Sequence, residues 1–408
     1  MTIGLGAMIG AGVFAAFAPA ARAAGTGLFA GLAIAAVVAY CNATSSARLA
    51  ARHPASGGTY VYGRERLGPF WGYLAGWGFV VGKTASCAAM ALTVAAYALP
   101  GADRPGRAAL AVAAVLALTA LNYFGVRKSV VVTRVIVALV LTVLALVVAA
   151  AVTRGHGANL VWAPGTTSLF GILQSAGLLF FAFAGYARVA TLGEEVRDPA
   201  RTIPRAIPIA LGVTLVVYAV TAVAVVAALG PAATGAAPDP LAAAAAGWPW
   251  LVPVVRAGAV LAALGSLLAL VLGVSRTVLA MARDGHLPRT LAAAHPRHRV
   301  PHHAEVAVGV TVALLVSFVD LRGAIGFSSF AVLVHYAIAN ASALTLRPGE
   351  GRPPRAVPVL GLLGCLVLAA TLPVGSVLVG ASVLAMGAVI WLARDRRPQS
   401  SGARHPTV

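Results

Sequence analysis

Two glycine-containing interruptions are the features of this sequence whose residue types and spacing could do chemistry. Residues 4–12 hold four glycines, and residues 180–188 run from an aromatic cluster through Gly185 to Arg188. Each glycine costs a helix up to about 1 kcal/mol relative to alanine. A helix that breaks there frees N–H groups at the start of one half and C=O groups at the end of the other. Freed N–H groups suit a carboxylate and freed carbonyls suit an ammonium group, so a zwitterionic amino acid would satisfy both.

The other polar residues do not form a catalytic site. All eleven acidic residues lie in loops or near the ends of apolar runs, and the sequence shows no nucleophile–base pair, zinc-ligand spacing or phosphate-binding loop. The five histidines within residues 286–303 do not repeat on one helix face, which favours a solvated loop over a metal site. We therefore expect no enzyme activity, no cofactor and no bound metal ion.

The composition indicates a protein embedded in a membrane. Of the 408 residues, 60% are hydrophobic and 10% are charged, with a mean hydropathy of +0.90. Soluble proteins carry about 45–50% apolar and about 25% charged residues. The net charge of +19 is dispersed between apolar runs rather than gathered on one basic face, which argues against a nucleic-acid partner. The sequence therefore predicts a polytopic membrane protein.

Twelve apolar stretches are separated by breaks that charge, proline or glycine marks. A helix needs about 20 such residues to cross the hydrocarbon core. The runs are continuous rather than alternating, which favours helices over the strands of a membrane barrel. We predict an all-α polytopic fold of about 12 transmembrane helices. The predicted spans lie near residues 1–21, 27–47, 69–99, 107–124, 129–153, 167–193, 206–230, 248–281, 304–319, 323–346, 356–373 and 375–393.

The basic residues of the connections predict the orientation. With a cytoplasmic N-terminus, the inner connections and the C-terminal tail hold 22 Lys and Arg residues and the outer connections hold 5. Short cytoplasmic loops carry such an excess of positive charge. We therefore expect a multi-pass protein of the cytoplasmic membrane with both termini in the cytoplasm.

The two glycine-containing interruptions fall in the first and sixth spans, five helices apart. An odd repeat length reverses the second copy, so the two spans are expected to run antiparallel. Paired broken helices at matching positions indicate a substrate site near the midplane of the bilayer. Only nine residues precede Gly10, about 14 Å of helix. We therefore expect either a start further upstream or an unusually short first half-helix.

Several motifs, taken in chain order, resemble those of the amino acid–polyamine–organocation (APC) permeases. The resemblance covers essentially the whole chain and implies the LeuT-type fold, in which two inverted five-helix repeats work by alternating access. It divides the chain into repeats at residues 1–153 and 167–346, two further helices at 356–393 and a cytoplasmic tail at 394–408. The motifs are Gly10-Ala11-Gly12-Val13-Phe14, Ala55-Ser56-Gly57-Gly58-Thr59-Tyr60, Phe181-Ala182-Phe183-Ala184-Gly185-Tyr186, Glu194-Glu195-Val196-Arg197-Asp198-Pro199 and Met281-Ala282-Arg283-Asp284-Gly285-His286-Leu287-Pro288.

The resemblance also implies the substrate-binding residues. Gly10, Ala11 and Gly12 would offer N–H groups to the substrate carboxylate. The sixth-span break would bind the α-amino group through carbonyls, and Phe181 lies where relatives place an aromatic ring that closes over the substrate. The residues implied at this second break are Phe181, Ala182, Ala184 and Gly185.

Two cations inside predicted spans are candidates for coupling or gating. A cation near the bilayer centre costs several kcal/mol and is by default a functional hypothesis. Lys83 could couple transport to a proton, brace backbone carbonyls or reach the cytoplasmic edge. Some relatives place a lysine in the fifth span, where this chain has Val140. Arg188 could pair with Glu195 in an inner gate or face the substrate path.

The sequence favours transport of a neutral amino acid, because no carboxylate is visible at midplane depth to offset a cationic substrate. An acidic amino acid is a lesser alternative, because Lys83 and Arg188 are cations inside spans. The expected partners are an amino acid, a proton or counter-substrate, and the lipid bilayer. A cationic amino acid or polyamine permease is one alternative, and a sensor that binds amino acids without moving them is another. The substrate side chain, the driving ion and the oligomeric state are not determined by the sequence.

Overall fold

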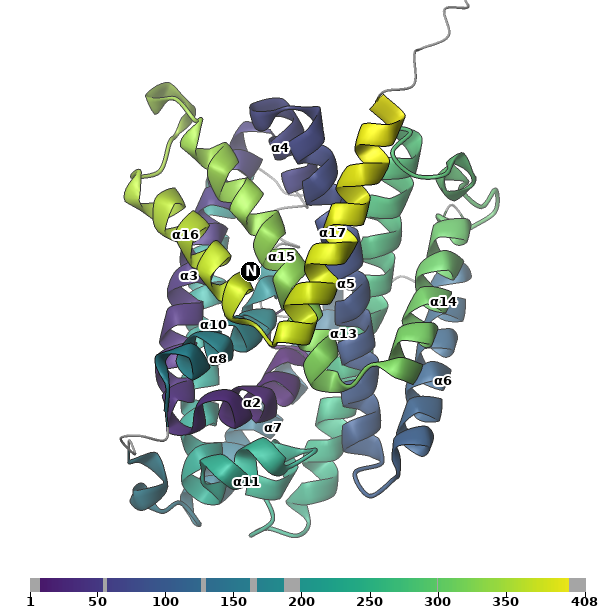
Figure 1. Ribbon diagram of the computed structural model, residues 1–408. Coiled ribbons are helices and arrows are strands. Elements are labelled where there is room, and N and C mark those ends of the chain that lie inside the picture. Colours follow the sequence, from purple (N-terminus) through teal and green to yellow (C-terminus); the bar gives the residue numbers. More distant parts are fainter. Residues whose placement is uncertain are drawn as a thin grey trace, which may run out of the picture.

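The computed structural model describes residues 8–53, 57–125, 130–161, 167–186, 199–298 and 300–395, and within these ranges every regular element is a helix (Figure 1). The predicted all-α class is therefore confirmed. Each of the twelve predicted apolar ranges overlaps a helix. In chain order these are α2 (Gly12–Ala24), α3 (Leu28–Arg52), α5 (Pro69–Ala98), α6 (Arg104–Tyr123), α7 (Val130–Val152), α8 (Leu169–Phe183), α10 (Pro199–Leu229), α13 (Leu251–Arg283), α14 (His302–Phe318), α15 (Leu321–Leu344), α16 (Ala356–Thr371) and α17 (Val374–Asp395).

Eight helical segments of the described chain are long and apolar enough to cross a membrane, the first of them running from Gly12 to Arg52 through α2 and α3. Three shorter apolar helices, α8, α14 and α16, accompany them. The main difference from the predicted boundaries is at helix ends. Helix α3 continues to Arg52 rather than stopping near residue 47, and His53 is its C-cap.

Two helices form the centre of the bundle. In their most apolar windows, α5 and α15 are each 83% buried, whereas α17 is 22% buried and borders the outside. Helix α5 packs against α15 and α13, and small residues allow the close approach. A Cβ on Gly82 of α5 would lie 2.9 Å from the Cβ of Ala331 of α15. Large exposed apolar side chains cover α6, α7, α16 and α17, as expected of surfaces that face lipid.

Short helices cap opposite ends of the bundle. Helix α4 (Thr59–Leu67) lies at the end shown at the top of Figure 1, and α11 (Pro231–Ala236) lies at the bottom, followed by α12 (Pro240–Ala244). Both α4 and α11 begin directly after a glycine with positive φ, Gly58 at 57° and Gly230 at 77°. L-residues with side chains rarely adopt this conformation, so glycine sets the turn into each helix. These two ends are called the α4 end and the α11 end below.

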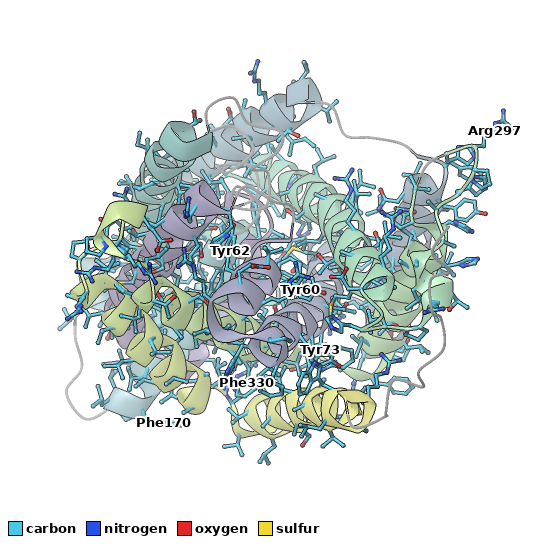
Figure 2. The ribbon with its side chains drawn as sticks, turned by 90° about the horizontal axis from the view of Figure 1, so that it is seen from above. Tyr60, Tyr62, Tyr73, Phe170, Arg297 and Phe330 are labelled. Carbon is cyan, nitrogen blue, oxygen red and sulfur yellow. The ribbon has the colours of Figure 1, made fainter. Side chains whose placement is uncertain are left out.

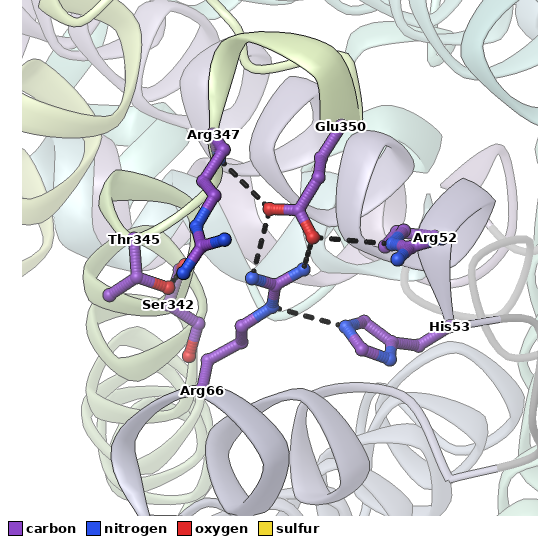
Figure 3. Close-up of polar contacts among 7 residues, drawn as sticks. All are labelled: Arg52, His53, Arg66, Ser342, Thr345, Arg347 and Glu350. Atoms are coloured by element: carbon purple, nitrogen blue, oxygen red, sulfur yellow. Dashed lines mark hydrogen bonds and ion pairs between the residues drawn. The ribbon is translucent and has the colours of Figure 1, made fainter.

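A charged network at the α4 end ties three connections together (Figure 3). Arg66 of α4 donates to both oxygens of Glu350, at 2.8 and 3.0 Å, and Arg52 at the end of α3 donates at 3.3 Å. Glu350 lies in η5 (Pro348–Glu350), between α15 and α16, where it also accepts the main-chain N–H of Arg347. These donors lower the pKa of Glu350 to about 2. The carboxylate therefore stays ionised and holds α4 to α3 and to the α15–α16 connection.

Replacing Glu350→Gln is expected to lower the thermal unfolding temperature equally at about pH 5 and pH 8. Because the pKa is lowered, its stabilisation is fully present above the ordinary carboxyl pKa and is lost only as the pH falls toward about 2. Glu65→Gln is the matched control, because the Glu65–Arg64 pair is exposed and exposed pairs contribute little. An effect of Glu350→Gln that disappears at pH 5 would contradict this description.

Candidate functional site

The first span is interrupted where the glycines predicted. Met8 is helical, Ile9 and Gly10 form a bend, Ala11 forms a turn, and α2 begins at Gly12. The carbonyl of Ala11 accepts the N–H groups of Phe14 and Ala15 at 3.1 and 3.0 Å. Helix α2 has no side-chain cap, and the N–H groups of Gly12 and Val13, which precede these two donors, have no acceptor within α2 itself.

The sixth predicted span changes helix type at its predicted break. Helix α8 begins with the Ser168 side chain accepting the N–H of Gly171 and ends at Phe183, where η3 (Ala184–Tyr186) follows. The N–H of Ala184 bonds to the carbonyls of both Phe180 and Phe181. The predicted residues Phe181 and Ala182 are thus in the last turn of α8, and Ala184 and Gly185 are in η3.

The two interruptions meet inside the bundle. A Cβ on Gly12 would lie 2.7 Å from the Cα of Ala182, so only glycine allows this approach. At the far ends of the same helices, the Thr167 hydroxyl donates to the carbonyl of Ala24. Helix α8 therefore starts where α2 ends and ends where α2 starts, which makes the two helices antiparallel.

A tyrosine of α10 joins the two interruptions. The Tyr218 hydroxyl lies 2.5 Å from the carbonyl oxygen of Met8 and 3.1 Å from that of Ala182. The side chain is fully buried. The Tyr218 hydroxyl is thus within hydrogen-bond distance of one main-chain oxygen from each break. Sequence reasoning missed Tyr218, although a hydroxyl in the middle of an apolar run was an available signal.

Lys83 lies against the second break. Lys83 lies on α5, and its Nζ donates to the carbonyl oxygen of Ala184 at a distance of 3.2 Å. The residue is 6% exposed. No carboxylate of the described residues lies within ion-pair distance of this ammonium group. A buried Lys83 does not agree with the predicted alternative in which its side chain reaches the membrane edge. Its hydrogen bond to the Ala184 carbonyl is the contact expected if it braces a main-chain carbonyl. Arg188 and Glu195, the other predicted pair, lie outside the described residues.

The α11 side of the meeting point is sealed by aromatic rings. Phe14 packs edge-on against Tyr97, and Tyr218 packs against both Phe17 and Phe183, with ring centroids 5.2–6.5 Å apart. Beyond this seal, the Arg22 guanidinium donates to the carbonyl of Gly235 in α11 at 2.7 Å. Arg256, a third cation within a predicted span, forms an ion pair with Asp239 at 2.8 Å.

A pocket opens on the opposite side, at the α4 end. Its walls include Tyr60 and Tyr62 of α4, and its inner part reaches Phe79 of α5 and His335 of α15. Seen from this end, Tyr60 lies near the middle of the bundle (Figure 2). Phe79 and His335 have ring centroids 5.3 Å apart, and Lys83 follows Phe79 by one helical turn. The pocket therefore stops one turn short of the cation at the break.

Polar contacts hold the mouth of this pocket. The Tyr60 hydroxyl donates to Asp284, which follows α13, and its oxygen accepts from His286 Nδ1 at 2.9 Å. Arg64 also donates to Asp284, and Arg394 of α17 donates to the carbonyl of His286. Burial and the hydrogen bond to Asp284 raise the pKa of Tyr60, and burial lowers the pKa of His286. Near pH 7 the tyrosine is therefore protonated and the imidazole neutral.

The loop histidines are closer together than the sequence indicated. The rings of His298 and His302 lie 4.7 and 5.2 Å from that of His295, around Tyr123. In the parts of the chain that the structure describes, no group of three or more His, Cys, Asp or Glu side chains is arranged to hold a metal ion.

Comparisons with known proteins identify the family. The profile of the amino acid permease family matches residues 1–394. The chain belongs to the amino acid permease family, within the APC superfamily. Its similarity extends to an uncharacterised transporter of Mycobacterium tuberculosis, which is 66% identical over 100% of this chain and 94% of that protein. The family membership predicted from the motifs is confirmed, and the chain is a membrane transporter rather than an enzyme.

More distant relatives carry named substrates. The branched-chain amino acid permease BcaP of Bacillus subtilis is 31% identical over 90% of this chain and 85% of that protein. The chloroplastic cationic amino acid transporter 7 of Arabidopsis thaliana is 30% identical over 83% of this chain and 63% of that protein.

Replacing Gly12→Ala is expected to reduce transport by about tenfold to a hundredfold, because the new Cβ must displace the backbone of Ala182 and misplace the groups of both breaks. The measurement is uptake by proteoliposomes at equal protein content. Gly212→Ala in α10 is the control, since its Cβ would meet no atom within 4 Å. Equal activity of the two variants would contradict the close approach of α2 and α8.

Proposed function

We propose that this permease is a secondary active transporter that moves a neutral amino acid across the cytoplasmic membrane by alternating access. The observation that carries the proposal is the meeting of two interrupted helices at Gly12 and Ala182. A helix break frees main-chain N–H groups, and those around Gly10, Ala11 and Gly12 would suit the substrate carboxylate. Carbonyls at Phe181, Ala182 and Ala184, with Gly185 allowing close approach, suit the α-amino group.

The packing of the helices supports two inverted repeats, at residues 1–153 and 167–346. In this assignment α2, α3, α5 and α6 correspond to α8, α10, α13 and α14. Each of these four pairs packs together, as expected of copies related by an axis through the bundle. Helices α4 and α11 follow corresponding members and cap opposite ends, which an inversion requires. The proposed fold is therefore LeuT-type with about 12 crossings, the helices of residues 356–393 lying outside the repeats.

The charges near the breaks support a neutral substrate. The buried acids of the described chain are Asp239, which pairs with Arg256, and Glu305 of α14. Glu305 is therefore located by α14, which packs against α5, α6 and α13. Among the described residues, the charged side chain in contact with the breaks is the cation Lys83, which opposes a positively charged substrate side chain. BcaP, by its name a permease for branched-chain amino acids, agrees with this assignment. The cationic amino acid transporters favour the alternative, and a non-transporting sensor remains the other one.

The contacts at the α4 end and the α11 end of the bundle support an inward-facing arrangement. The arginine-rich connections after α3, α13 and α15 meet α4, as the contacts of Glu350 and Asp284 with α4 show. By the distribution of positive charge, the α4 end is then cytoplasmic. The seal lies at the α11 end and the pocket at the α4 end. Transport would require the seal to open and the pocket to close.

Uptake by proteoliposomes tests the proposal. Labelled leucine, alanine, glutamate, arginine and putrescine are offered under imposed proton, sodium or counter-substrate gradients. We expect accumulation of leucine or alanine and little competition by arginine or putrescine. Preferential uptake of arginine or putrescine would favour the cationic alternative, and specific binding without uptake would favour the sensor.

Lys83→Met is expected to abolish proton-driven accumulation while exchange of internal for external substrate continues. The reason is that methionine keeps the apolar stem but has no proton to release and no donor for the Ala184 carbonyl. The measurement is accumulation at several external pH values, with Lys83→Arg as the variant that keeps the donor. Accumulation against a gradient with unchanged pH dependence in Lys83→Met would remove Lys83 from coupling.

A further inference from the structure

The pocket at the α4 end is small and polar. We propose that it holds one or two water molecules, and that His335 on its inner wall passes a proton between Lys83 at the second break and this water. This inference rests on the proposed function, because it names the route by which a driving proton leaves toward the cytoplasm.

The size of the pocket suits water. Its volume is about 20 Å³, and a cavity needs about 10–15 Å³ for a water molecule, together with about two to four polar partners. One such partner is Ser46 of α3, which lines the pocket and is 2% exposed. Its hydroxyl has no hydrogen-bond partner among the described residues. A buried hydroxyl without a partner is destabilising, and a water in the pocket relieves this cost.

The start of α4 supplies further partners for water. Gly58 precedes this helix with no side-chain cap, and its carbonyl accepts the N–H groups of Val61 and Tyr62 at 3.0 and 3.1 Å. The N–H groups of Thr59 and Tyr60 have no acceptor within the helix. Thr59 and Tyr60 line the pocket together with Gly58. Polar groups from α3 and α4 therefore meet at a space of the size of water.

His335 of α15 lines the same pocket with one ring nitrogen fixed. Its Nδ1 lies 2.9 Å from the carbonyl oxygen of Ala75. Because a carbonyl only accepts, Nδ1 carries a hydrogen, and Nε2 of the neutral ring is then an acceptor. No hydrogen bond to Nε2 is found among the described residues. Nε2 is therefore the atom of this ring that can take up and release a proton.

Lys83 lies close to this ring. The rings of Phe79 and His335 are 5.3 Å apart, and Lys83 follows Phe79 by one helical turn on α5. Gly82, next to Lys83, fits against Ala331, which precedes His335 by one turn on α15. The packing of α5 on α15 thus places the two bases next to each other, with Lys83 on the side of the break and His335 on the side of the pocket.

The charges around the two bases favour one shared proton. Among the described residues, no Asp or Glu lines the pocket, and no carboxylate lies within ion-pair distance of Lys83. Of the charged side chains on the described parts of the helices packed against α15, Lys83 is the one that acts on His335. The other titratable groups of the pocket are Tyr60, Tyr62 and Tyr336, and the thiols of α3, α5 and α16 are buried. Because like charges oppose each other, the proton occupies one base at a time.

The relay moves one proton and changes no other covalent bond. With the α4 end facing the cytoplasm, an N–H bond of the Lys83 ammonium breaks as an N–H bond forms at His335 Nε2. Nε2 then gives the proton to water in the pocket, which passes it to the cytoplasm past the mouth held by Tyr60 and Asp284. Lys83 is left as a neutral amine, which still has N–H groups to donate to the Ala184 carbonyl.

Replacing His335→Asn tests the relay in the full-length protein in proteoliposomes. Asparagine keeps an N–H donor for the Ala75 carbonyl but has no basic nitrogen. A gradient of about one pH unit supports about tenfold accumulation of leucine at one proton per leucine. We expect the variant to equilibrate leucine without accumulating it and to import no protons with it, as a pH-sensitive dye inside the vesicles reports. Exchange of internal for external leucine is expected to continue at the wild-type rate.

Two neighbouring serines give the matched control. Ser46→Ala removes a partner of the water and is expected to slow proton-driven uptake by about threefold without slowing exchange. Ser45 is also buried and without a partner among the described residues, but it does not line the pocket, so Ser45→Ala is expected to match the wild type. Unchanged proton-driven accumulation in His335→Asn, or equal effects of the two serine variants, would overturn the relay. Loss of exchange in both His335→Asn and His335→Gln would also overturn it, because the role of His335 would then be structural.

The water can be detected without transport. A short X-ray pulse makes hydroxyl radicals from bound water, and these oxidise the side chains beside it. Tyr336 lines the pocket and Tyr97 packs in the aromatic seal, and each is 1% exposed. We expect oxidation of Tyr336 in the wild-type protein and little oxidation of Tyr97, whereas a Tyr336 as unreactive as Tyr97 would overturn the water site.

The outcomes for the relay and for the proposed function are distinguishable. Wild-type uptake that is driven by sodium or by counter-substrate but not by protons would overturn the relay and leave the proposed function. Failure of the wild-type protein to take up any amino acid would overturn the proposed function, while oxidation of Tyr336 would still support the water site.

Discussion

Main-chain groups that lose their helical partners inside a bilayer must find new ones, because lipid offers none. This constraint governs the centre of the protein. Helix α2 starts and helix α8 changes type at the same place, so donors and acceptors are freed together. Two side chains from other helices, Tyr218 and Lys83, donate hydrogen bonds to main-chain carbonyls at the breaks. In the proposed function, the substrate carboxylate is the acceptor for the donors at the start of α2.

Close packing of small residues makes this arrangement possible. Gly12 allows α2 to touch the backbone of α8, and Gly82 brings α5 against α15 in the register that sets Lys83 beside Ala184. Where apolar burial from water does not drive helices together, such contacts and hydrogen bonds hold them. A side chain added at either glycine would change both the packing and the positions of the freed groups.

The two ends of the bundle differ in chemistry. Aromatic rings close the α11 side of the meeting point, and beyond them lie the contact of Arg22 with the Gly235 carbonyl and the Arg256–Asp239 ion pair. Ion pairs and hydrogen bonds hold the α4 end through Glu350, Asp284 and Tyr60. The Asp284 and Glu350 side chains are partly exposed, so water can replace their partners when the connections move. Both ends therefore have contacts that would have to exchange in the proposed alternating-access cycle.

Composition and local pattern by themselves determined the membrane class, the helical ranges and the places where the first and sixth helices are interrupted. These features depend on apolar run length and on glycine, which act within one segment. The tertiary structure decided what lies across from each segment. It placed Lys83 on the Ala184 carbonyl, joined the breaks through Tyr218, paired Arg256 with Asp239 and put Ser46 in a pocket with the start of α4. Such contacts join residues far apart in the chain, and they depend on the rotation and depth of each helix, which packing of the whole bundle sets.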